Sequence, residues 1–297
     1  MTTTTEPIDN KVKQVISNIR NLPTPPIVFH QIQKVINDPN ASAAQVASVL
    51  AEDPAMSVKV LKLTNSAFYG LAREVESVRQ AVVIVGMEAV KNLVLSASVL
   101  DMFKSDELDQ EYQEAFWRHS LATAFCCRLL ARNLKSRGIV DPDSIFSAGL
   151  LHDIGKLIIC CFLPTEYAKL KADRDADNES PDHQVEERIL KYNHAQIGGF
   201  LAVQWKLPAK LGEAIAYHHH PQLTESDSPI AYIVHIGNWL AKRTFFDRTQ
   251  QYLVGELGEG VAEYMGISDA DLDRFSEMLR EEYVKAETFM AMAGLGG

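Results

Sequence analysis

The sequence predicts an all-α protein in which an N-terminal helical lobe packs on a larger helical bundle. Two observations support this fold class. Apolar residues recur at spacings of three and four over many segments, which is the period of a helix with one buried face. Residues that favour helix N-termini stand directly before several of these segments. No convincing alternation of apolar and polar residues, the pattern of a half-buried strand, was found.

Helix starts are clearest in the first hundred residues. Ser42 followed by Gln45 has the spacing of a capping box. Asp53 precedes Pro54, which places an N-cap residue before a proline at the first helical position. The helix that follows carries one apolar stripe: Met56, Val60, Leu63 and Ala67. After Gly86, a second stripe marks a longer helix: Val90, Leu93, Ala97 and Leu100.

The chain divides into three predicted parts. Residues 1–20 form a polar N-terminal segment, residues 21–103 the N-terminal lobe, and residues 104–297 the second lobe with the C-terminal helices. The polar, acidic stretch 104–111 is expected to be the junction between the two lobes, and the stretches 173–182 and 221–229 are expected to be loops. Ser268 is expected to cap the last helix, whose apolar stripe is Leu272, Phe275, Leu279 and Tyr283.

Charge and composition exclude several classes of protein. The 297 residues carry a formal net charge of −10 without a run of Lys or Arg, which disfavours direct DNA binding. Uncharged apolar runs such as 157–163 are too short to span a bilayer, and the start of the chain lacks the pattern of a secretory signal. The cysteines, as adjacent pairs at 126–127 and 160–161, are expected to be small buried apolar residues in a reducing compartment. The sequence therefore predicts a soluble cytoplasmic protein.

Histidines are concentrated in the second lobe. His119 shares a helical face with Phe116, Thr123 and Cys126 and is expected to point inward, which a hydrogen-bonded core histidine would also do. His194 alone indicates little. His218, His219 and His220 end an apolar stripe, where histidines commonly satisfy the last carbonyls of a helix. Each histidine therefore has an ordinary structural interpretation.

The pair His152 and Asp153 is harder to explain by structure alone. It lies in the apolar stretch LLHDIGK, where a charged aspartate is costly to bury unless a cation or a basic side chain pairs with it. Imidazoles and a carboxylate from several helices are the ligands that a divalent transition metal needs. Helical bundles build such sites from facing helices. The residues alone therefore predict a candidate histidine-rich metal site.

The order of these residues resembles the HD superfamily of metal-dependent phosphohydrolases, including its HD-GYP branch. Other segments narrow the resemblance to the HDOD family, the HD-related output domains, over roughly residues 20 to 240. They are Leu22-Pro23, TNSAFYG at 64–70, 81–95 around Gly86, FWRHS at 116–120, HAQIG at 194–198, WKLP at 205–208 and AYHH at 216–219.

The resemblance implies an all-α fold and a role in bacterial signal transduction, often near cyclic-dinucleotide, chemotaxis or two-component pathways. Many relatives have lost HD ligands and are regarded as non-enzymatic. In this chain, the resemblance assigns His119, His152 and Asp153 to the first metal ligands. It assigns His194, His218 and His219 to the additional ligands of the two-metal branch. Lys156 matches the lysine that faces substrate phosphate; its ordinary interpretation is a solvated lysine at a helix end.

Two departures from the HD pattern bear on catalysis. Asn238 stands where the last HD ligand, an aspartate, is expected; its carbonyl oxygen can bind a metal, but it has no negative charge and cannot act as a base. Nearby His235 could replace that ligand, although a core role is favoured. The Gly-Tyr-Pro element is missing after His219, where the chain reads His220-Pro221-Gln222, and this argues against hydrolysis of cyclic-di-GMP.

The leading hypothesis is a signalling output module that acts through protein contacts and has no or weak catalytic activity. Its site would hold a divalent metal (Fe, Mn or Zn) or none. The alternative is a metal-dependent phosphohydrolase acting on a nucleotide or cyclic dinucleotide, with Asp153 and Lys156 as its catalytic residues. A third hypothesis, a nucleic-acid-binding regulator, has only the helical N-terminal lobe in its favour.

Overall fold

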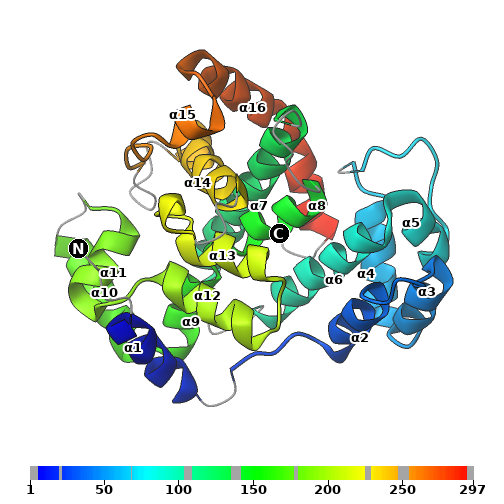
Figure 1. Cartoon of the computed structure of the whole chain (residues 1–297), viewed down its shortest axis with the longest axis horizontal. Helices are drawn as coiled ribbons and strands as arrows, with labels where there is room; N and C mark the ends of the chain where they lie inside the picture. Colours follow the sequence, from blue (N-terminus) through cyan, green and yellow to red (C-terminus); the bar gives the residue numbers. More distant parts are fainter. Residues whose placement is uncertain are drawn as a thin grey trace. The chain divides into compact units, whose positions relative to one another are not determined.

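A computed structural model describes residues 6–19, 22–67, 69–103, 109–134, 142–176, 180–224, 229–246 and 254–292 of the chain (Figure 1). Within these ranges the regular elements are all helices and no strand occurs, which confirms the predicted fold class. The chain forms two compact units. One comprises residues 23–117 and 281–297, and the other comprises residues 1–22 and 118–280.

The unit of residues 23–117 is built from short helices. They are α2 (Ile27–Ile36), α3 (Ala43–Ala51), α4 (Pro54–Thr64), α5 (Val78–Val85) and α6 (Met87–Met102). The predicted capping box is present, because Ser42 Oγ accepts from the Gln45 backbone N–H and the Gln45 side chain accepts from that of Ser42. Asp53 caps α4 as predicted. Gly86 adopts φ 96° between α5 and α6, a conformation that favours glycine.

The second unit holds the histidines. Its helices are α1 (Glu6–Ser17), α7 (Gln110–Asn133) from residue 118 onward, α8 (Pro142–Leu151), α9 (Ile154–Phe162), α10 (Pro164–Ala176), α11 (Asp182–Leu190), α12 (His194–Gln204), α13 (Ala209–Tyr217), the 3₁₀ helix η2 (Pro221–Leu223), α14 (Pro229–Ala241), the π-helix η3 (Lys242–Phe246), α15 (Val261–Met265) and α16 (Asp269–Met292) up to residue 280.

Ser268 caps α16 by accepting from the Asp271 backbone N–H, as predicted. The other predicted boundaries are only partly covered. The expected junction 104–111 lies largely outside the described residues, and the predicted division at residue 104 stays a prediction. The two compact units meet in sequence within α7, between Trp117 and Arg118. Within the predicted loop 221–229, residues 221–223 form η2, and residues 225–228 lie outside the described ranges.

The predicted loop 173–182 is wrong at both ends. Residues 173–176 continue α10, and Asp182 is the first residue of α11. Both terminal aspartates have cationic partners, since Asp173 pairs with Arg188 and Asp182 pairs with Lys156 and Arg174. A run of polar residues suggested solvent exposure because the sequence does not show these partners.

The cysteines are free thiols, as expected. Cys126 and Cys127 are fully buried, and burial raises the pKa of both thiols. Cys160 and Cys161 are half-buried, so the prediction of burial is wrong for this pair. They lie at the end of α9, where the helix reaches the edge of the core.

One stretch, residues 144–162, is long and apolar enough to cross a membrane by length and composition alone. It corresponds to α8 and α9 with the turn between them, and 83% of it is buried inside the protein. It also contains Asp153 and Lys156, which face other residues of the unit. This stretch is therefore typical of the core of a helical protein.

Close packing at glycines brings the helices of this unit together. A Cβ atom at Gly155 in α9 would lie 2.0 Å from the carbonyl oxygen of His194, the first residue of α12. On the other side of α12, Gly199 packs against Ala216 of α13, and Figure 1 shows α12 beside α13. The absence of a side chain at Gly155 therefore determines how closely His194 approaches the turn that carries His152 and Asp153.

We expect Gly155→Ala to lower the free energy of unfolding by about 3 kcal/mol or more, because the new methyl group meets backbone that cannot move without separating α9 from α12. Chemical denaturation measures this change. Gly212→Ala in α13 is the matched control, since its Cβ would lie 3.5 Å from that of Ala202, an ordinary contact. The control should be neutral or slightly stabilising, and equal effects of the two substitutions would contradict the packing argument.

Candidate metal centre

A turn between α8 and α9 carries His152 and Asp153. Leu151 ends α8, and Ile154 begins α9, so the two residues project from a short connection between helices. His152 is fully buried and Asp153 is 1% exposed. His152 Nδ1 lies 2.7 Å from the Gly149 carbonyl oxygen, which fixes the orientation of the ring. The turn therefore directs a carboxylate and an imidazole into the core.

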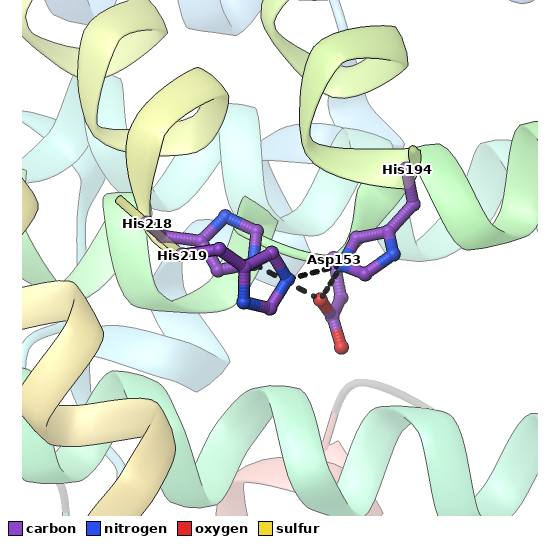
Figure 2. A group of neighbouring side chains, drawn as sticks. All are labelled: Asp153, His194, His218 and His219. Carbon is purple, nitrogen blue, oxygen red and sulfur yellow. Dashed lines mark hydrogen bonds and ion pairs between the residues drawn. The ribbon is translucent and has the colours of Figure 1, made fainter. Parts of the chain in front are cut away.

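Three other elements add histidines to this point. His119 comes from α7 and is fully buried, as its helical face predicted. His194 is the first residue of α12, where Asn193 and Gln196 form a capping box. His218 and His219 directly follow α13, and Figure 2 shows their rings and that of His194 pointing toward Asp153.

The described residues contain two groups of candidate metal ligands that share Asp153. Asp153, His194, His218 and His219 form the first group, and His119, His152 and Asp153 form the second. Within each group the ligand atoms lie within 4.8 Å of one another. His194 Nε2 is 2.9 Å from Asp153 Oδ1, and His119 Nε2 is 3.3 Å from His152 Nε2. These six residues are called the histidine–aspartate cluster below.

The Nδ1 atoms show which ring nitrogens are available to a metal. His152 and His218 direct Nδ1 at the backbone carbonyls of Gly149 and Ile215, and His194 directs it at Glu186 Oε2, 2.7 Å away. Carbonyl and carboxylate oxygens only accept hydrogen bonds here, so each Nδ1 must carry the proton. In the neutral ring each Nε2 then has a lone pair, and all three lone pairs point into the cluster.

Burial and charge determine the protonation of the cluster. Burial lowers the pKa values of His119, His218 and His219 well below the ordinary value, so these rings are neutral. Burial acts to raise the pKa of Asp153, but His152, Lys156 and His194 outweigh it and hold that pKa well below its usual range. The cluster therefore combines one carboxylate with mostly neutral imidazoles.

His194 differs from the other rings. Burial lowers its pKa, but Glu186 and Asp153 outweigh this effect and raise the pKa to about 9. The protonated ring of His194 is therefore stabilised between two carboxylates, with Nδ1 facing Glu186 and the added proton on Nε2 facing Asp153. A divalent cation would replace that proton, because it satisfies the same lone pairs with a larger charge.

These donors fit a divalent transition metal. Imidazole nitrogens and one carboxylate converge on one point, an arrangement that is repulsive unless a proton or a metal cation lies between them. The hydrogen bonds from Nδ1 to carbonyl and carboxylate oxygens are the outer contacts that orient histidine ligands in metal sites. The chemistry of the donors, and their burial, therefore both support a metal centre at this point.

Lys156 is 8% exposed, so the interpretation as a solvated lysine is wrong. Its ammonium group lies 2.8 Å from Asp153 Oδ2 and 2.9 Å from Asp182 Oδ2. Both contacts are ion pairs with buried or half-buried carboxylates. Lys156 therefore lies beside the cluster, with its charge shared by two carboxylates of the protein, and its role toward a substrate phosphate stays a prediction.

Two residues of α14 are candidates for the last ligand. His235 directs Nδ1 at the His218 carbonyl oxygen, and its Nε2 accepts from the Gly258 backbone N–H, so both nitrogens are engaged outside the cluster. This agrees with the core role. Asn238 is 5% exposed, and its Oδ1 has no hydrogen-bond partner among the described residues. Its role as a ligand stays a prediction, as do the ligand roles of the cluster.

Sequence reasoning missed three residues of α11 that contact the centre. Glu186 accepts from both the ring and the backbone N–H of His194. The His183 ring stacks on that of His219 with centroids 3.9 Å apart. Asp182 pairs with Lys156. The one signal in the sequence was a spacing of three and four residues, which places all three on one side of a helix.

The fold and the cluster together define an all-helical protein of the HD type, with a buried histidine–aspartate centre. The HDOD domain profile matches residues 22–221, about two thirds of the chain, and the chain belongs to this family. The predicted membership of the HDOD family is therefore confirmed.

Solved structures agree with this assignment. An HDOD domain protein of unknown function from Geobacter sulfurreducens is 25% identical, with a TM-score of 0.77 over 98% of both chains. A candidate phosphohydrolase from Shewanella amazonensis is 26% identical, with a TM-score of 0.72 over 97% of this chain and 98% of the other. A candidate signal transduction protein from Marinobacter aquaeolei, 20% identical with a TM-score of 0.76, has the same fold.

Curated relatives match over part of their length. An uncharacterised Treponema pallidum protein is 25% identical over 225 residues, which are 75% of this chain and 43% of that protein. Ribonuclease Y of Geobacter sulfurreducens is 27% identical over 159 residues, which are 52% of this chain and 24% of the enzyme. The chain thus spans less than half of each of these relatives.

We expect the affinity for Mn²⁺ to rise by up to about tenfold per pH unit toward pH 9, because His194 must release a proton before its Nε2 can bind a cation. In Glu186→Gln the pKa of His194 falls, so the rise should end at a lower pH. Calorimetric titration with Mn²⁺ under anaerobic conditions, repeated at several pH values, measures the affinity of the unaltered protein and of Glu186→Gln. Glu187→Gln keeps an oxygen for Asn193 and should retain the original profile. If the affinity changed with pH in the same way for all three proteins, His194 would not be a metal ligand whose pKa Glu186 raises.

Proposed function

We propose that this protein is a bacterial HDOD signalling module that binds a divalent metal at the histidine–aspartate cluster and acts through protein contacts. One observation supports it above the others: buried imidazole lone pairs converge on a single buried carboxylate. Such an arrangement attracts a cation, and a metal ion can take the place of the proton on His194. Hydrolysis would in addition need a charged ligand at the position of Asn238 and a lysine that binds substrate phosphate.

The metal would be held by Asp153 and by histidines from three other elements. Asp153 belongs to both groups of donors, so it would be a ligand of a metal held by either group. The bound ion would supply a positive charge that joins α7, the turn before α9, the start of α12 and the end of α13. Because the metal is bound by the folded chain and not by the unfolded one, it stabilises this arrangement of helices. This stabilisation of the folded helices is sufficient for a structural or regulatory role of the metal.

Partners and location follow from the family and from the charge. Signalling proteins are the proposed partners, and the cytoplasm is the proposed location. A net charge of −10 argues against DNA as the direct target. A nucleotide or cyclic dinucleotide remains a candidate ligand, because the centre combines metal donors with a lysine.

A second candidate function, metal-dependent phosphohydrolysis, has specific support. The cluster contains all six donors that the HD resemblance assigns, and two metals at such a site can activate water. One similar solved structure is a candidate phosphohydrolase, and similar curated proteins are named ribonuclease Y. In that case Asp153 would position the ions and Lys156 would hold the phosphate group.

Two features make hydrolysis the second choice. Asn238 provides no negative charge, so Asp153 is the single charged member among the predicted ligands, and ions are held less firmly against a negatively charged substrate. Lys156 is paired with Asp153 and Asp182, so two carboxylates compete with a substrate for its charge. Both features weaken catalysis more than they weaken metal binding.

We expect protein purified without added metal or chelator to contain Fe, Mn or Zn, and Asp153→Ala to lose it, because the carboxylate common to both donor groups is removed. Elemental analysis measures the content, and circular dichroism checks that the fold is retained. The exposed Asp273, changed to Ala, is the control and should keep the metal. If folded Asp153→Ala retained the full metal content, the proposed centre would be wrong.

We expect little or no hydrolysis of cyclic-di-GMP, linear dinucleotides, nucleotides or short RNA when Mn, Fe or Zn is supplied. Asn238→Asp should strengthen metal binding by restoring a charged ligand, and competition with a chelator measures that affinity. Asn40→Asp, at an exposed position outside the unit that holds the cluster, is a control for the added charge. Robust turnover by the unaltered protein, abolished by Asp153→Ala with the fold intact, would make hydrolysis the leading function.

A further inference from the structure

The N-terminal helix α1 belongs to the unit that holds the histidine–aspartate cluster, although the chain continues from it into α2 of the other unit. Val12 and Ile16, four residues apart and therefore on one face of α1, are 2% and 3% exposed. The helix packs on α12 (Figure 1). Its other face is open to solvent, since Lys13, Gln14 and Ser17 are exposed. A narrow apolar stripe therefore holds α1 against the unit.

Lys11 adds a polar contact between α1 and the end of α11. Its ammonium group donates to the Leu190 carbonyl oxygen, 2.8 Å away. Leu190 is the last residue of α11, where carbonyl oxygens lack partners inside the helix and favour a cation. The same ammonium group lies 5.7 Å from the centre of the Tyr192 ring, and Tyr192 is 3% exposed. One lysine thus joins α1 to the residues that connect α11 with α12.

The junction between α11 and α12 positions His194. Residues 191–193 separate the two helices, and His194 is the first residue of α12. Glu186 Oε2 accepts from the backbone N–H of His194 at 2.7 Å and lies 2.7 Å from its Nδ1. The contact between Glu186 and His194 therefore depends on how the end of α11 meets the start of α12. The α1 helix contacts both of these elements, through Lys11 and through its apolar face.

The folding of α1 is coupled to its docking. A helix of 12 residues is marginally stable by itself in water, so α1 is helical because it is docked. Elements held by few buried side chains open more readily than the core of the same unit. The α1 helix thus has two states, docked and folded or released and unfolded.

We propose that α1 is a conformational clasp for the histidine–aspartate cluster. Docked, it holds the junction between α11 and α12 so that Glu186 orients His194; released, it loosens this junction and weakens metal binding. Lys11 is the positioning residue at the contact with α11. As regulation of the metal centre, the clasp rests on the proposed function.

Hydrogen exchange of the His194 backbone amide tests the clasp in protein without metal. We expect Ile16→Asp, which places a charge in the buried face of α1, to speed this exchange about tenfold or more, because Glu186 then holds the N–H less firmly. Lys11→Met should speed it by a smaller factor, since the apolar face is retained. NMR spectroscopy gives the rates, and circular dichroism identifies the variants that fold.

Lys13→Met is the matched control for Lys11→Met. It removes the same charge from the same helix, but Lys13 is exposed and makes no hydrogen bond or ion pair with the residues that the structure describes. The exchange of the His194 amide should therefore be that of the unaltered protein. An equal increase in Lys11→Met and Lys13→Met would show an effect of net charge and would overturn the role of Lys11.

Titration with Mn²⁺ tests whether the clasp acts on the metal centre. We expect Ile16→Asp to weaken Mn²⁺ binding about fivefold or more, and Lys13→Met to leave it unchanged. Thermodynamic linkage requires the reverse effect, so saturating Mn²⁺ must slow the exchange of the Val12 and Ile16 amides of the unaltered protein by the same factor. A helix that only covers apolar surface would not respond to the metal. Calorimetry gives the affinities.

The two measurements fail separately. Unchanged exchange of the His194 amide in folded Ile16→Asp overturns the clasp, whether or not metal binds. Equal Mn²⁺ affinities of Ile16→Asp and the unaltered protein overturn its action on the centre. If the unaltered protein binds no metal but Ile16→Asp speeds the exchange, the proposed metal centre fails, and α1 still holds the junction. If Ile16→Asp does not fold, Lys11→Met, compared with Lys13→Met, decides both points.

Discussion

Burial of the Asp153 carboxylate is the constraint on which the rest of this unit depends. An ionised carboxylate that is 1% exposed costs several kcal/mol unless cations or hydrogen-bond donors surround it. The structure supplies Lys156 on one side and imidazoles from three other elements on the other. Gly155, two residues after Asp153, lets the helix that begins with His194 approach closely enough to take part. Helix packing and the chemistry of the centre are therefore consequences of the same buried charge.

Several histidines serve structure and site at once. His218 is the C-cap residue of α13 and bonds the Ile215 carbonyl through Nδ1, which is the ordinary role of a histidine at a helix end. Because Nδ1 is engaged, Nε2 is directed at Asp153, 3.5 Å away. His152 likewise bonds the Gly149 carbonyl through Nδ1, and its Nε2 is 3.3 Å from Asp153 Oδ1. The structural and the functional interpretations of these residues are not alternatives, since one hydrogen bond creates the geometry that the other needs.

The α11 helix connects the centre with its surroundings. It places Asp182 on Lys156, His183 on His219 and Glu186 on His194, so one nine-residue helix contacts three members of the site. Its position explains why the retained Lys156 does not by itself indicate catalysis.

The sequence by itself determined the helical fold class, the caps at Ser42, Asp53 and Ser268, and the family, because these depend on local spacing and on ordered motifs. It also supplied the six residues of the cluster, since the motif order carries them. It did not show Glu186, His183 or Asp182, and it suggested a loop where Asp182 pairs with two cations. Which nitrogen of each ring faces Asp153, and which carboxylate neutralises Lys156, was decided only by the tertiary structure. Such contacts join residues that are distant in sequence, and a local pattern contains no information about the partner across the fold.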